Sequence, residues 1–235
     1  MIDFLITELQ KVNITLNEVQ QNQFITYYNL LLEWNEKMNL TAITEPQEVA
    51  IKHFYDSITF LMNVEVKKGS KIIDVGTGAG FPGIPLKIMR PDICLTLLDS
   101  LNKRLNFLKE VCKELNIEAE FIHSRAEEGG RNKNLREKFD IATSRAVANM
   151  NTLAEYNIPY VKVGGKLVAM KGKSGKEEMS RAKGAIKALG GEITDCFEFK
   201  LPNGDDRTII VAEKIAHTPK QYPRQSAKIK NSPLN

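Results

Sequence analysis

The stretch SKIIDVGTGAGFPGIP at residues 70–85 constrains the fold of this chain more than any other. Its run IIDV is mostly apolar and β-branched, which predicts a strand buried on both faces of a parallel sheet. The chain then turns through Gly76, Gly78 and Gly80 and meets two early prolines, which the first turn of a helix tolerates. A strand that turns on glycines into a helix presents free backbone N–H groups to a ligand, and the missing side chains let that ligand lie against the backbone.

The nature of the ligand depends on the residue before the glycines. Gly78-x-Gly80-x-x-Gly83 matches the dinucleotide-binding pattern, but three glycines at this spacing are weak support on their own. Strands of dinucleotide-binding folds usually run apolar into their glycines, whereas here Asp74 stands two residues before the first glycine. An acid followed by G-x-G-x-G resembles the cofactor loop of S-adenosylmethionine (SAM) methyltransferases. We expect Asp74 to hold the α-ammonium group of SAM; a tight turn without a ligand is the alternative.

Length and composition allow one α/β domain with a large core and an appendage. The chain has 235 residues, of which 42% are hydrophobic and 26% charged, as in an ordinary soluble globular protein. No apolar run is long enough to span a membrane, and the first residues lack the basic region and cleavage site of an export signal. We therefore expect a cytoplasmic protein without a membrane partner. The three cysteines are scattered without zinc-ligand spacing, so no metal site is expected.

Charge is distributed unevenly along the chain. Residues 1–65 carry three lysines and nine acids, whereas residues 214–235 carry five basic residues and no acid. This asymmetry favours a directed surface for a polyanion, although a solvated tail is an equally simple explanation. We expect a helical extension over residues 1–65 packed on the catalytic domain, a main domain over residues 66–214, and a basic tail beyond the sheet over residues 215–235.

The amino-terminal third of the chain shows apolar residues at helical spacing. Two capping boxes, Thr15 with Glu18 and Thr44 with Gln47, predict where a second and a third helix begin. The motif HFxDS at residues 53–57 puts a histidine and an acid three positions apart, so both lie on one helix face. Such a histidine is more often a structural residue than a catalyst, and the roles of both side chains stay open.

From residue 70 onward, predicted strands and helices alternate, which indicates a parallel sheet with right-handed crossovers. The predicted strands cover residues 71–75, 93–98, 119–123, 139–142 and 166–170, followed by a hairpin of residues 192–200 and 208–213. The turn PNGD between the last two strands predicts the hairpin. This α/β pattern resembles the Rossmann-like fold of class I SAM-dependent methyltransferases, a seven-stranded, mostly parallel sheet with a carboxy-terminal antiparallel hairpin. A plain dinucleotide-binding domain does not predict the hairpin.

The carboxyl ends of parallel strands carry the site in this architecture. Asp99 ends the second strand, about 20 residues beyond the glycine loop, where an acid binds the ribose hydroxyls of either NAD or SAM. Arg145 and Lys171 follow the fourth and fifth strands, so two strand ends are basic. A substrate that bears phosphate or an electron-rich base explains these charges better than a carboxylate or an amine does.

Motifs outside the glycine loop make a resemblance specific. They are WNxxxNLT from residue 34, HFxDS from 53, DVGTGAGFPGIPL from 74, SRAEE from 124, SRA from 144, MKG from 170, and RTIIVxxK with TPxxYPR from 207. Together these motifs resemble the glucose-inhibited division protein B family, also called methyltransferase G of the small ribosomal subunit. The similarity extends over nearly the whole chain, from residue 34 to residue 224.

This resemblance implies a reaction and a set of site residues. The family transfers a methyl group from SAM to N7 of one guanine in the 530 loop of bacterial 16S rRNA, near the decoding site. The implied partner is therefore 16S rRNA in the small ribosomal subunit or its assembly precursor. We expect cofactor binding by Asp74, Gly76, Gly78, Gly80, Phe81, Asp99, Ala126, Glu127 and Arg145. We expect RNA binding by Arg125, Lys171, Arg207, Lys220 and Arg224, with Arg145 and Lys171 as the catalytic residues.

The chemistry of guanine N7 is compatible with this set. N7 is an acceptor with a free lone pair and no proton, so its methylation needs no general base. Arg145 is our candidate for contacting the guanine, with Lys171 on a nearby phosphate. The alternatives are another SAM-dependent RNA or small-molecule methyltransferase, a dehydrogenase, and a ribosome-binding protein without catalysis. We expect the protein to act as a monomer.

Overall fold

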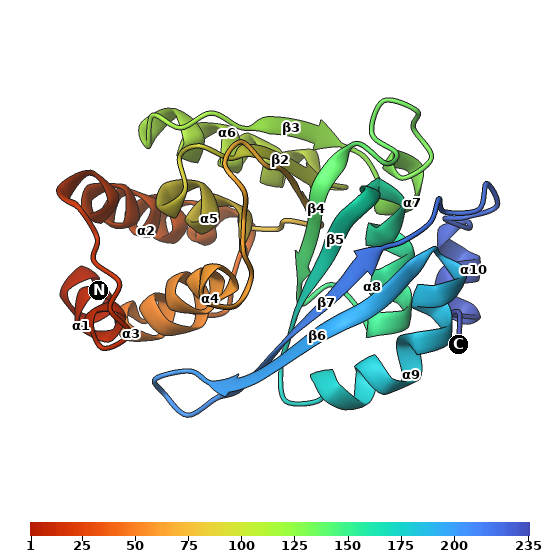
Figure 1. Cartoon of the computed structure of the whole chain (residues 1–235). Helices are drawn as coiled ribbons and strands as arrows, with labels where there is room; N and C mark the ends of the chain where they lie inside the picture. Colours follow the sequence, from red (N-terminus) through yellow and green to blue (C-terminus); the bar gives the residue numbers. More distant parts are fainter.

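A twisted sheet of seven strands separates two layers of helices in the computed structural model, which describes all 235 residues (Figure 1). The strands are β1 (Lys71–Val75), β2 (Cys94–Asp99), β3 (Glu120–His123), β4 (Phe139–Arg145), β5 (Val161–Lys171), β6 (Gly191–Lys200) and β7 (Asp206–Lys214). Their order is β3-β2-β1-β4-β5-β7-β6; β7 runs antiparallel to both neighbours, and every other pairing is parallel. The predicted parallel sheet with a carboxy-terminal antiparallel hairpin is confirmed.

Helices cover both faces of this sheet. They are α1 (Ile2–Gln10), α2 (Glu18–Met38), α3 (Pro46–Val49), α4 (Asp56–Asn63), α5 (Gly83–Met89), α6 (Asn102–Glu114), α7 (Ala126–Gly129), α8 (Met150–Asn157), α9 (Gly175–Ala188) and α10 (Ser226–Asn231). A π-helical turn over Ala50–Tyr55 joins α3 to α4, and a short 3-10 turn over Ile158–Tyr160 precedes β5. The helices up to α6 lie on one side and α8, α9 and α10 on the other, so the two chain ends lie at opposite sides of the molecule (Figure 1).

The central strands are apolar on both faces because each face packs against helices. Ile72 belongs to a core cluster that includes residues of α4 and α5, whereas its neighbour Ile73 belongs to a cluster on the opposite face. On β5, Val168 and Leu167 divide between two clusters in the same way. The alternation of side chains along a strand thus builds two cores from one apolar run.

Strands β4 and β5 are longer than the sequence predicts. The prediction of residues 139–142 stopped at the first polar side chains, and that of residues 166–170 started after two glycines. In the structure the pairing of β4 with β5 continues through buried Thr143 and Ser144 to Arg145, and β5 already begins at Val161, which pairs with Phe139 ahead of a shift in register. Arg145 and Lys171 are therefore the last residues of their strands rather than loop residues.

Aromatic packing attaches the amino-terminal helices to the rest of the molecule. Phe24 and Tyr27 of α2 lie 5.0 and 5.4 Å from Phe54, measured between ring centroids. Tyr27 also stacks on Phe81 of the glycine loop at 5.3 Å. The same hydrophobic cluster continues from Leu5 of α1 to residues of α6 and β2, so the helices of the first 63 residues share a core with the sheet.

The predicted starts of two helices are wrong by one or two residues. Helix α2 is capped by Asn17, whose side chain accepts a hydrogen bond from the backbone of Gln20 while the Gln20 side chain accepts one from Asn17. This capping box replaces the predicted pair of Thr15 and Glu18. Helix α3 is capped by the Glu45 carboxylate rather than by a Thr44 hydroxyl, because the proline at position 46 fixes the first helical residue.

The segment after β7 is folded against the sheet layer. Helix α10 packs against α8, and Ile229 within it is fully buried. A hydrogen bond from the side chain of Asn151 to the Leu234 carbonyl holds the last residues to α8. Part of the segment expected as a basic tail, residues 215–235, is therefore folded on the α8 side of the molecule.

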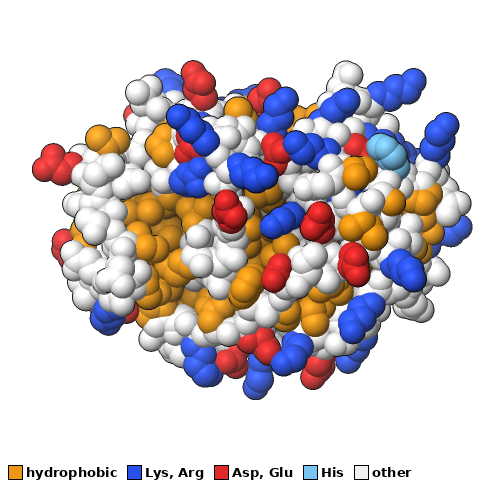
Figure 2. Space-filling view, viewed as in Figure 1, with side chains coloured by type: hydrophobic (Ala, Val, Ile, Leu, Met, Phe, Trp, Pro, Cys, Tyr) orange, Lys and Arg blue, Asp and Glu red, His pale blue; other side chains and the backbone are white.

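The surface carries charge of both signs with one broad apolar area. Figure 2 shows hydrophobic side chains gathered between the amino-terminal helices and the β6–β7 edge, and lysine and arginine side chains around the upper, right-hand and lower parts of the view. None of the helices has both the length and the apolar character that crossing a membrane requires.

Candidate active site

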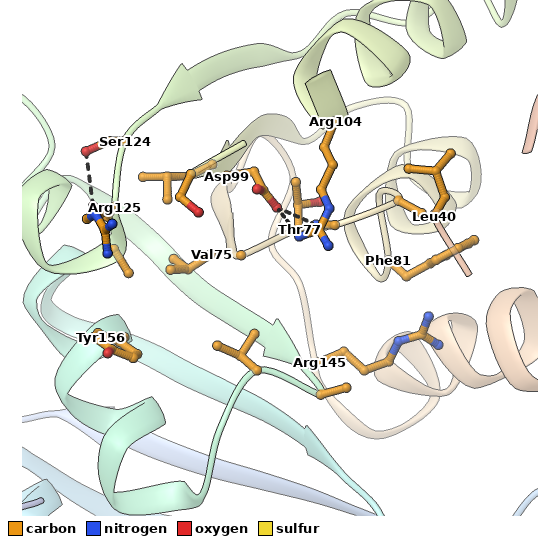
Figure 3. A pocket seen from close by; sticks show the side chains of 18 of the residues that line it. Leu40, Val75, Thr77, Phe81, Asp99, Arg104, Ser124, Arg125, Arg145 and Tyr156 are labelled. Carbon is orange, nitrogen blue, oxygen red and sulfur yellow. Dashed lines mark hydrogen bonds and ion pairs between the residues drawn. The ribbon is translucent and has the colours of Figure 1, made fainter. Parts of the chain in front are cut away.

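A cavity of about 530 Å³ opens at the carboxyl ends of β1, β2 and β4 (Figure 3). Its lining includes seven of the nine predicted cofactor residues: Gly76, Gly78, Phe81, Asp99, Ala126, Glu127 and Arg145. Asp74 and Gly80 do not line it. Phe81 and Arg145 lie at one end of the cavity, and Arg125 and Tyr156 lie at the other (Figure 3). Its volume is in the range of roughly 300–1,000 Å³ typical of small-molecule sites.

The glycines of the loop are needed for different structural reasons. Gly76, Gly78 and Gly80 all have positive φ, at 72°, 60° and 101°, a region that side chains disfavour. At Gly80 a Cβ would lie 2.6 Å from the Tyr27 hydroxyl oxygen and 2.8 Å from atoms of two further side chains, so this glycine serves packing. At Gly78 a Cβ would meet no atom within 4 Å, so this glycine leaves the loop bare toward the cavity it lines.

Asp99 at the end of β2 is buried and held by the loop it supports. Its Oδ2 accepts a hydrogen bond of 2.9 Å from the Gly78 backbone N–H, and its Oδ1 accepts one of the same length from Leu101. Arg104 lies 3.5 Å from the same carboxylate. Figure 3 shows Asp99 in the middle of the cavity beside Thr77 and Arg104. A carboxylate fixed in this way keeps lone pairs for the hydroxyls of a ribose.

Asp74 lies beneath the glycine loop, fully buried. Its Oδ2 accepts hydrogen bonds of 2.8 Å from the Thr77 hydroxyl and 2.9 Å from the Gly83 backbone, whereas its Oδ1 is buried without any partner. Burial raises the pKa of Asp74 to about 6, although these two hydrogen bonds oppose the shift. The structure therefore shows Asp74 as a group that holds the loop and has one oxygen left over. It shows no direct approach from Asp74 to the cavity.

The aromatic ring of Phe81 is contacted by another aromatic ring and by a cation. The His53 ring stacks on it with centroids 4.6 Å apart and planes inclined by 19°. The guanidinium carbon of Arg145 lies 4.9 Å from the Phe81 centroid, a distance at which a cation is attracted to an aromatic face. The glycine loop, β4 and the π-helical turn thus meet at this one side chain.

His53 is a neutral ring held in place. Burial and the neighbouring Arg145 cation lower its pKa to about 3. Its Nε2 lies 2.9 Å from the Thr41 hydroxyl oxygen and its Nδ1 lies 3.3 Å from an Arg145 nitrogen. Nδ1 also lies 3.1 Å from the Lys52 carbonyl oxygen, so both ring nitrogens have partners within the protein. A ring with so low a pKa is a poor proton acceptor at neutral pH.

Asp56 ties two arginines together from the first turn of α4. Its Oδ2 accepts a hydrogen bond of 3.0 Å from Arg145, and its Oδ1 accepts one of 3.1 Å from Arg207 on β7. Arg145 also donates to the Lys52 carbonyl at 2.9 Å. His53 and Asp56 of the HFxDS motif, whose roles the sequence leaves open, both contact the Arg145 guanidinium. Their shared helix face predicts that they lie on the same side.

A second cavity, of about 310 Å³, adjoins the first. The two cavities share His53, Arg145 and Ala146 in their linings. The second one also contains Asp56 and Glu178, the only carboxylates in its lining, and both are in ion pairs. Arg145 therefore stands at the boundary between two spaces, and the smaller one offers no free acid. We name the larger space the cofactor cavity and the smaller one the acceptor cavity.

At the opposite end of the cofactor cavity, Glu127 is a buried carboxylate without an ion pair or hydrogen bond within the protein. The preceding residue, Ala126, accepts a hydrogen bond of 2.6 Å from the Tyr160 hydroxyl through its carbonyl, which fixes the start of α7. Arg125, next in line, is exposed and makes no ion pair. This end therefore has unpaired charge of both signs for a ligand.

The remaining predicted RNA-binding residues differ in how free they are. Lys220 is exposed. Lys171 is buried, with its Nζ 2.7 Å from Glu178 and donating to the Ala148 carbonyl at 2.6 Å. The ammonium of Lys171, which we expected on a nearby phosphate, is thus already held by a carboxylate and a carbonyl group of the protein.

Arg224, which we expected to bind RNA, is also paired within the protein. It forms a two-point ion pair with Glu155 of α8, whose side chain is fully buried. The side chain of Arg224 retains only 14% of its exposure. It thus neutralises a buried acid through Nε and one terminal nitrogen of its guanidinium.

Several residues that line the cofactor cavity were not assigned to it from the sequence, among them three from the carboxy-terminal part of the chain. Tyr156 on α8 and Ser226 and Lys230 on α10 belong to segments that show no motif at strand ends. Their only sequence signal is the helical spacing of residues 226 and 230, which puts both on one side of a turn. No cluster of histidine, cysteine and acidic side chains that could hold a metal ion is present in the chain.

This fold and cavity define a class of enzyme. Solved structures with the same fold include a methyltransferase from Pyrococcus furiosus (TM-score 0.56, 15% identity, 83% of this chain and 99% of that one). A SAM-dependent O-methyltransferase from Thermotoga maritima (TM-score 0.53, 15% identity, 80% and 72% coverage) and TrmN from Thermus thermophilus (TM-score 0.53, 14% identity, 68% and 48% coverage) are also similar. Identities this low show the fold alone, which is that of class I SAM-dependent methyltransferases.

Within that class, the chain belongs to the GidB family, the rRNA small subunit methyltransferase G family, whose model matches residues 20–209. A relative named ribosomal RNA small subunit methyltransferase G from Lactobacillus johnsonii is 52% identical over 97% of both chains. One of the same name from Clostridium perfringens is 51% identical over 95% of this chain and 94% of its own. The family predicted from the sequence motifs is confirmed.

Proposed function

We propose that this protein transfers a methyl group from SAM to N7 of one guanine in the 530 loop of 16S rRNA. Its family and relatives are named for methylation of small-subunit rRNA. The observation that carries the choice of N7 is the acceptor cavity, in which both carboxylates, Asp56 and Glu178, are in ion pairs. A ribosomal substrate implies a cytoplasmic enzyme, and we propose that it acts as a monomer.

The absence of a free acid matters because acceptors differ in their protons. An amino or hydroxyl group must lose a proton when it is methylated, whereas guanine N7 offers a lone pair and carries no proton. His53 is the other side chain of this cavity that could accept a proton, but its pKa is lowered to about 3. The cavity is thus suited to hold an acceptor in position rather than to deprotonate it.

The residues of the cofactor cavity fit SAM. When bound, SAM supplies a methyl group on a positively charged sulfur. We propose that Asp99 accepts hydrogen bonds from its ribose and that the bare backbone at Gly76 and Gly78 approaches it closely. The free carboxylate of Glu127 and the backbone at Ala126 would accept or donate hydrogen bonds at the adenine.

Asp74 and Gly80 act indirectly in this proposal. Asp74 would stabilise the loop and would act on the α-ammonium of SAM only across a short gap, since its free Oδ1 is buried. Gly80 would contribute by letting Tyr27 pack against the loop. Phe81 would form the wall between the sulfur and the amino-terminal helices.

Arg145 is our candidate catalytic residue because it lines both cavities. Its guanidinium would contact O6 of the guanine while N7 stays free for the methyl group. We propose that Lys171 positions the acceptor cavity through its pair with Glu178, and that Arg207 does so through Asp56. The free cations Arg125 and Lys220 remain as phosphate contacts.

The test is methyl transfer to small ribosomal subunits that lack this modification. Labelled SAM, enzyme and either subunits or naked 16S rRNA are incubated, and the product nucleoside is identified after digestion. We expect labelled 7-methylguanosine at a single position. Label in another nucleoside would point to a different RNA methyltransferase, and label only in small molecules would point to a different substrate class.

A further inference from the structure

The chain between β7 and α10 is held by side chains dedicated to it. Glu155 on α8 accepts hydrogen bonds from the Arg224 backbone N–H at 2.7 Å and from its guanidinium at 2.7 to 3.1 Å. Since Glu155 is fully buried, this pair is present wherever the domain is folded, and an unpaired carboxylate there would be costly.

Two further arginines, both from the loop after α7, bind carbonyl groups of the same segment. Arg131 donates to the Pro223 carbonyl at 2.7 Å. Arg136 donates to the Tyr222 and Thr218 carbonyls, each at 2.7 Å. Buried Glu155, half-buried Arg136 and exposed Arg131 therefore hold the segment that ends two positions before α10 begins.

Helix α10 carries two polar side chains to the cofactor cavity. Ser226 and Lys230 line it, whereas Lys228 of the same helix does not. Helix α10 packs against α8, and α8 contributes Tyr156 to the cavity, so this wall belongs to the end that carries Arg125 and Glu127. No ion pair within the protein involves Lys230, so its ammonium is available to a ligand.

This end of the cavity is the one for the nucleoside. The methyl group must face the acceptor cavity, which adjoins the cofactor cavity at His53 and Arg145. The adenosine of a bound cofactor then extends toward Glu127 and Tyr156. Ring nitrogens of adenine and ribose hydroxyls accept hydrogen bonds, and the hydroxyl of Ser226 and the ammonium of Lys230 are donors.

We infer that α10 is a wall of the nucleoside site, in which Ser226 and Lys230 bind the adenosine part of SAM. This inference rests on the proposed cofactor but adds residues that lie more than 100 positions beyond the glycine loop. The competing role, in which α10 contacts RNA phosphates only, is an outcome of the test below.

The test measures binding of S-adenosylhomocysteine by calorimetry with no RNA present. Lys230→Gln shortens the side chain by one atom and removes its charge, and Lys228→Gln on the same helix is the matched control. We expect the dissociation constant to rise about tenfold for Lys230→Gln, the effect of one lost charge-assisted hydrogen bond, and to stay unchanged for Lys228→Gln. Adding Ser226→Ala to Lys230→Gln should weaken binding further.

A second measurement covers the ordering of the helix. Bound S-adenosylhomocysteine should slow tryptic cleavage after Lys228 and Lys230 in the wild type, and melting temperatures show that each variant is folded. Equal affinity of wild type and Lys230→Gln for S-adenosylhomocysteine, with weaker association of the variant with subunits, would overturn the inference in favour of an RNA contact. Failure of the wild type to bind S-adenosylhomocysteine would instead remove the proposed function itself.

Discussion

The cofactor cavity and the acceptor cavity meet at Arg145, yet they handle charge in opposite ways. In the cofactor cavity, Glu127 and Lys230 make no ion pair, so charged groups of both signs are left for a ligand. In the acceptor cavity, Asp56 and Glu178 are already neutralised by cations of the protein. In the proposed function, the first space would bind by polar contacts, whereas the second would hold an uncharged acceptor in position.

The largest expected effect is that of Arg145→Ala, which removes the residue the two cavities share. We expect the single-turnover rate of methyl transfer, at saturating SAM and subunits, to fall by more than ~100-fold, the scale of a lost charge-stabilising group. The measurement is a rapid-quench time course. If excess SAM restores the rate, Arg145 acts on the cofactor, and the boundary drawn between the two cavities is misplaced.

Asp99→Ala tests the cofactor cavity alone. Loss of a buried hydrogen-bonded contact to the ribose should weaken SAM binding by about one to two orders of magnitude, with little change in the saturated rate. Calorimetric titration measures it, and Glu128→Ala, an exposed acid outside both cavities, is the control. An unchanged affinity would show that Asp99 serves only to hold Gly78 and Leu101.

Asp56→Asn tests the acceptor cavity. An amide of the same size leaves two arginines without their shared counter-charge, so the position of Arg145 should loosen. We expect the rate at saturating substrates to fall about tenfold while the affinity for SAM changes little. If SAM affinity falls as much as the rate, the two cavities are not separate in function, and Asp56 belongs to both.

The smallest effect concerns Asp74 and depends on pH. Burial raises its pKa from 3.8 to about 6, so the folded state binds this proton more tightly than the unfolded chain does. The resulting stability is complete below the ordinary pKa and is lost as the pH rises through about 6.

The α-ammonium of SAM favours the ionised form of Asp74. We therefore expect SAM affinity of the wild type to increase about fivefold as the pH rises through this pKa, the effect of roughly 1 kcal/mol between two charges. In Asp74→Asn this step should be absent. If the variant keeps the step and only melts at a lower temperature, Asp74 holds the loop and does not act on the cofactor.

The sequence predicts those parts of the structure whose cause is local. The strand and glycine turn around Gly78 are visible because β-branched residues and glycines act at their own positions, and Asp99 follows at a spacing set by one strand–helix–strand unit. Asp56 and Arg145, by contrast, are separated by 89 positions, and Glu155 and Arg224 by 69. No local pattern joins such pairs, because only the packing of helices on the sheet brings them together.

The same reason explains why the sequence does not show which basic residues are paired within the protein. In the sequence, Lys171 and Arg224 appear as free cations because their partners lie on helices whose facing sides depend on the complete fold. Burial then decides the role, since a charged side chain in the interior must be paired. Arg125, by contrast, is exposed and makes no ion pair within the protein.

The double ion pair of Asp56 also sets an order of events during synthesis on the ribosome. Asp56 leaves the exit tunnel first. Arg145 follows 89 residues after Asp56, and Arg207 follows 151 residues after Asp56. At roughly 5–20 residues per second, the nascent chain spends about 8–30 s with this carboxylate incompletely matched. The acceptor cavity can be complete only after the final hairpin has emerged, because Arg207 of β7 belongs to its lining.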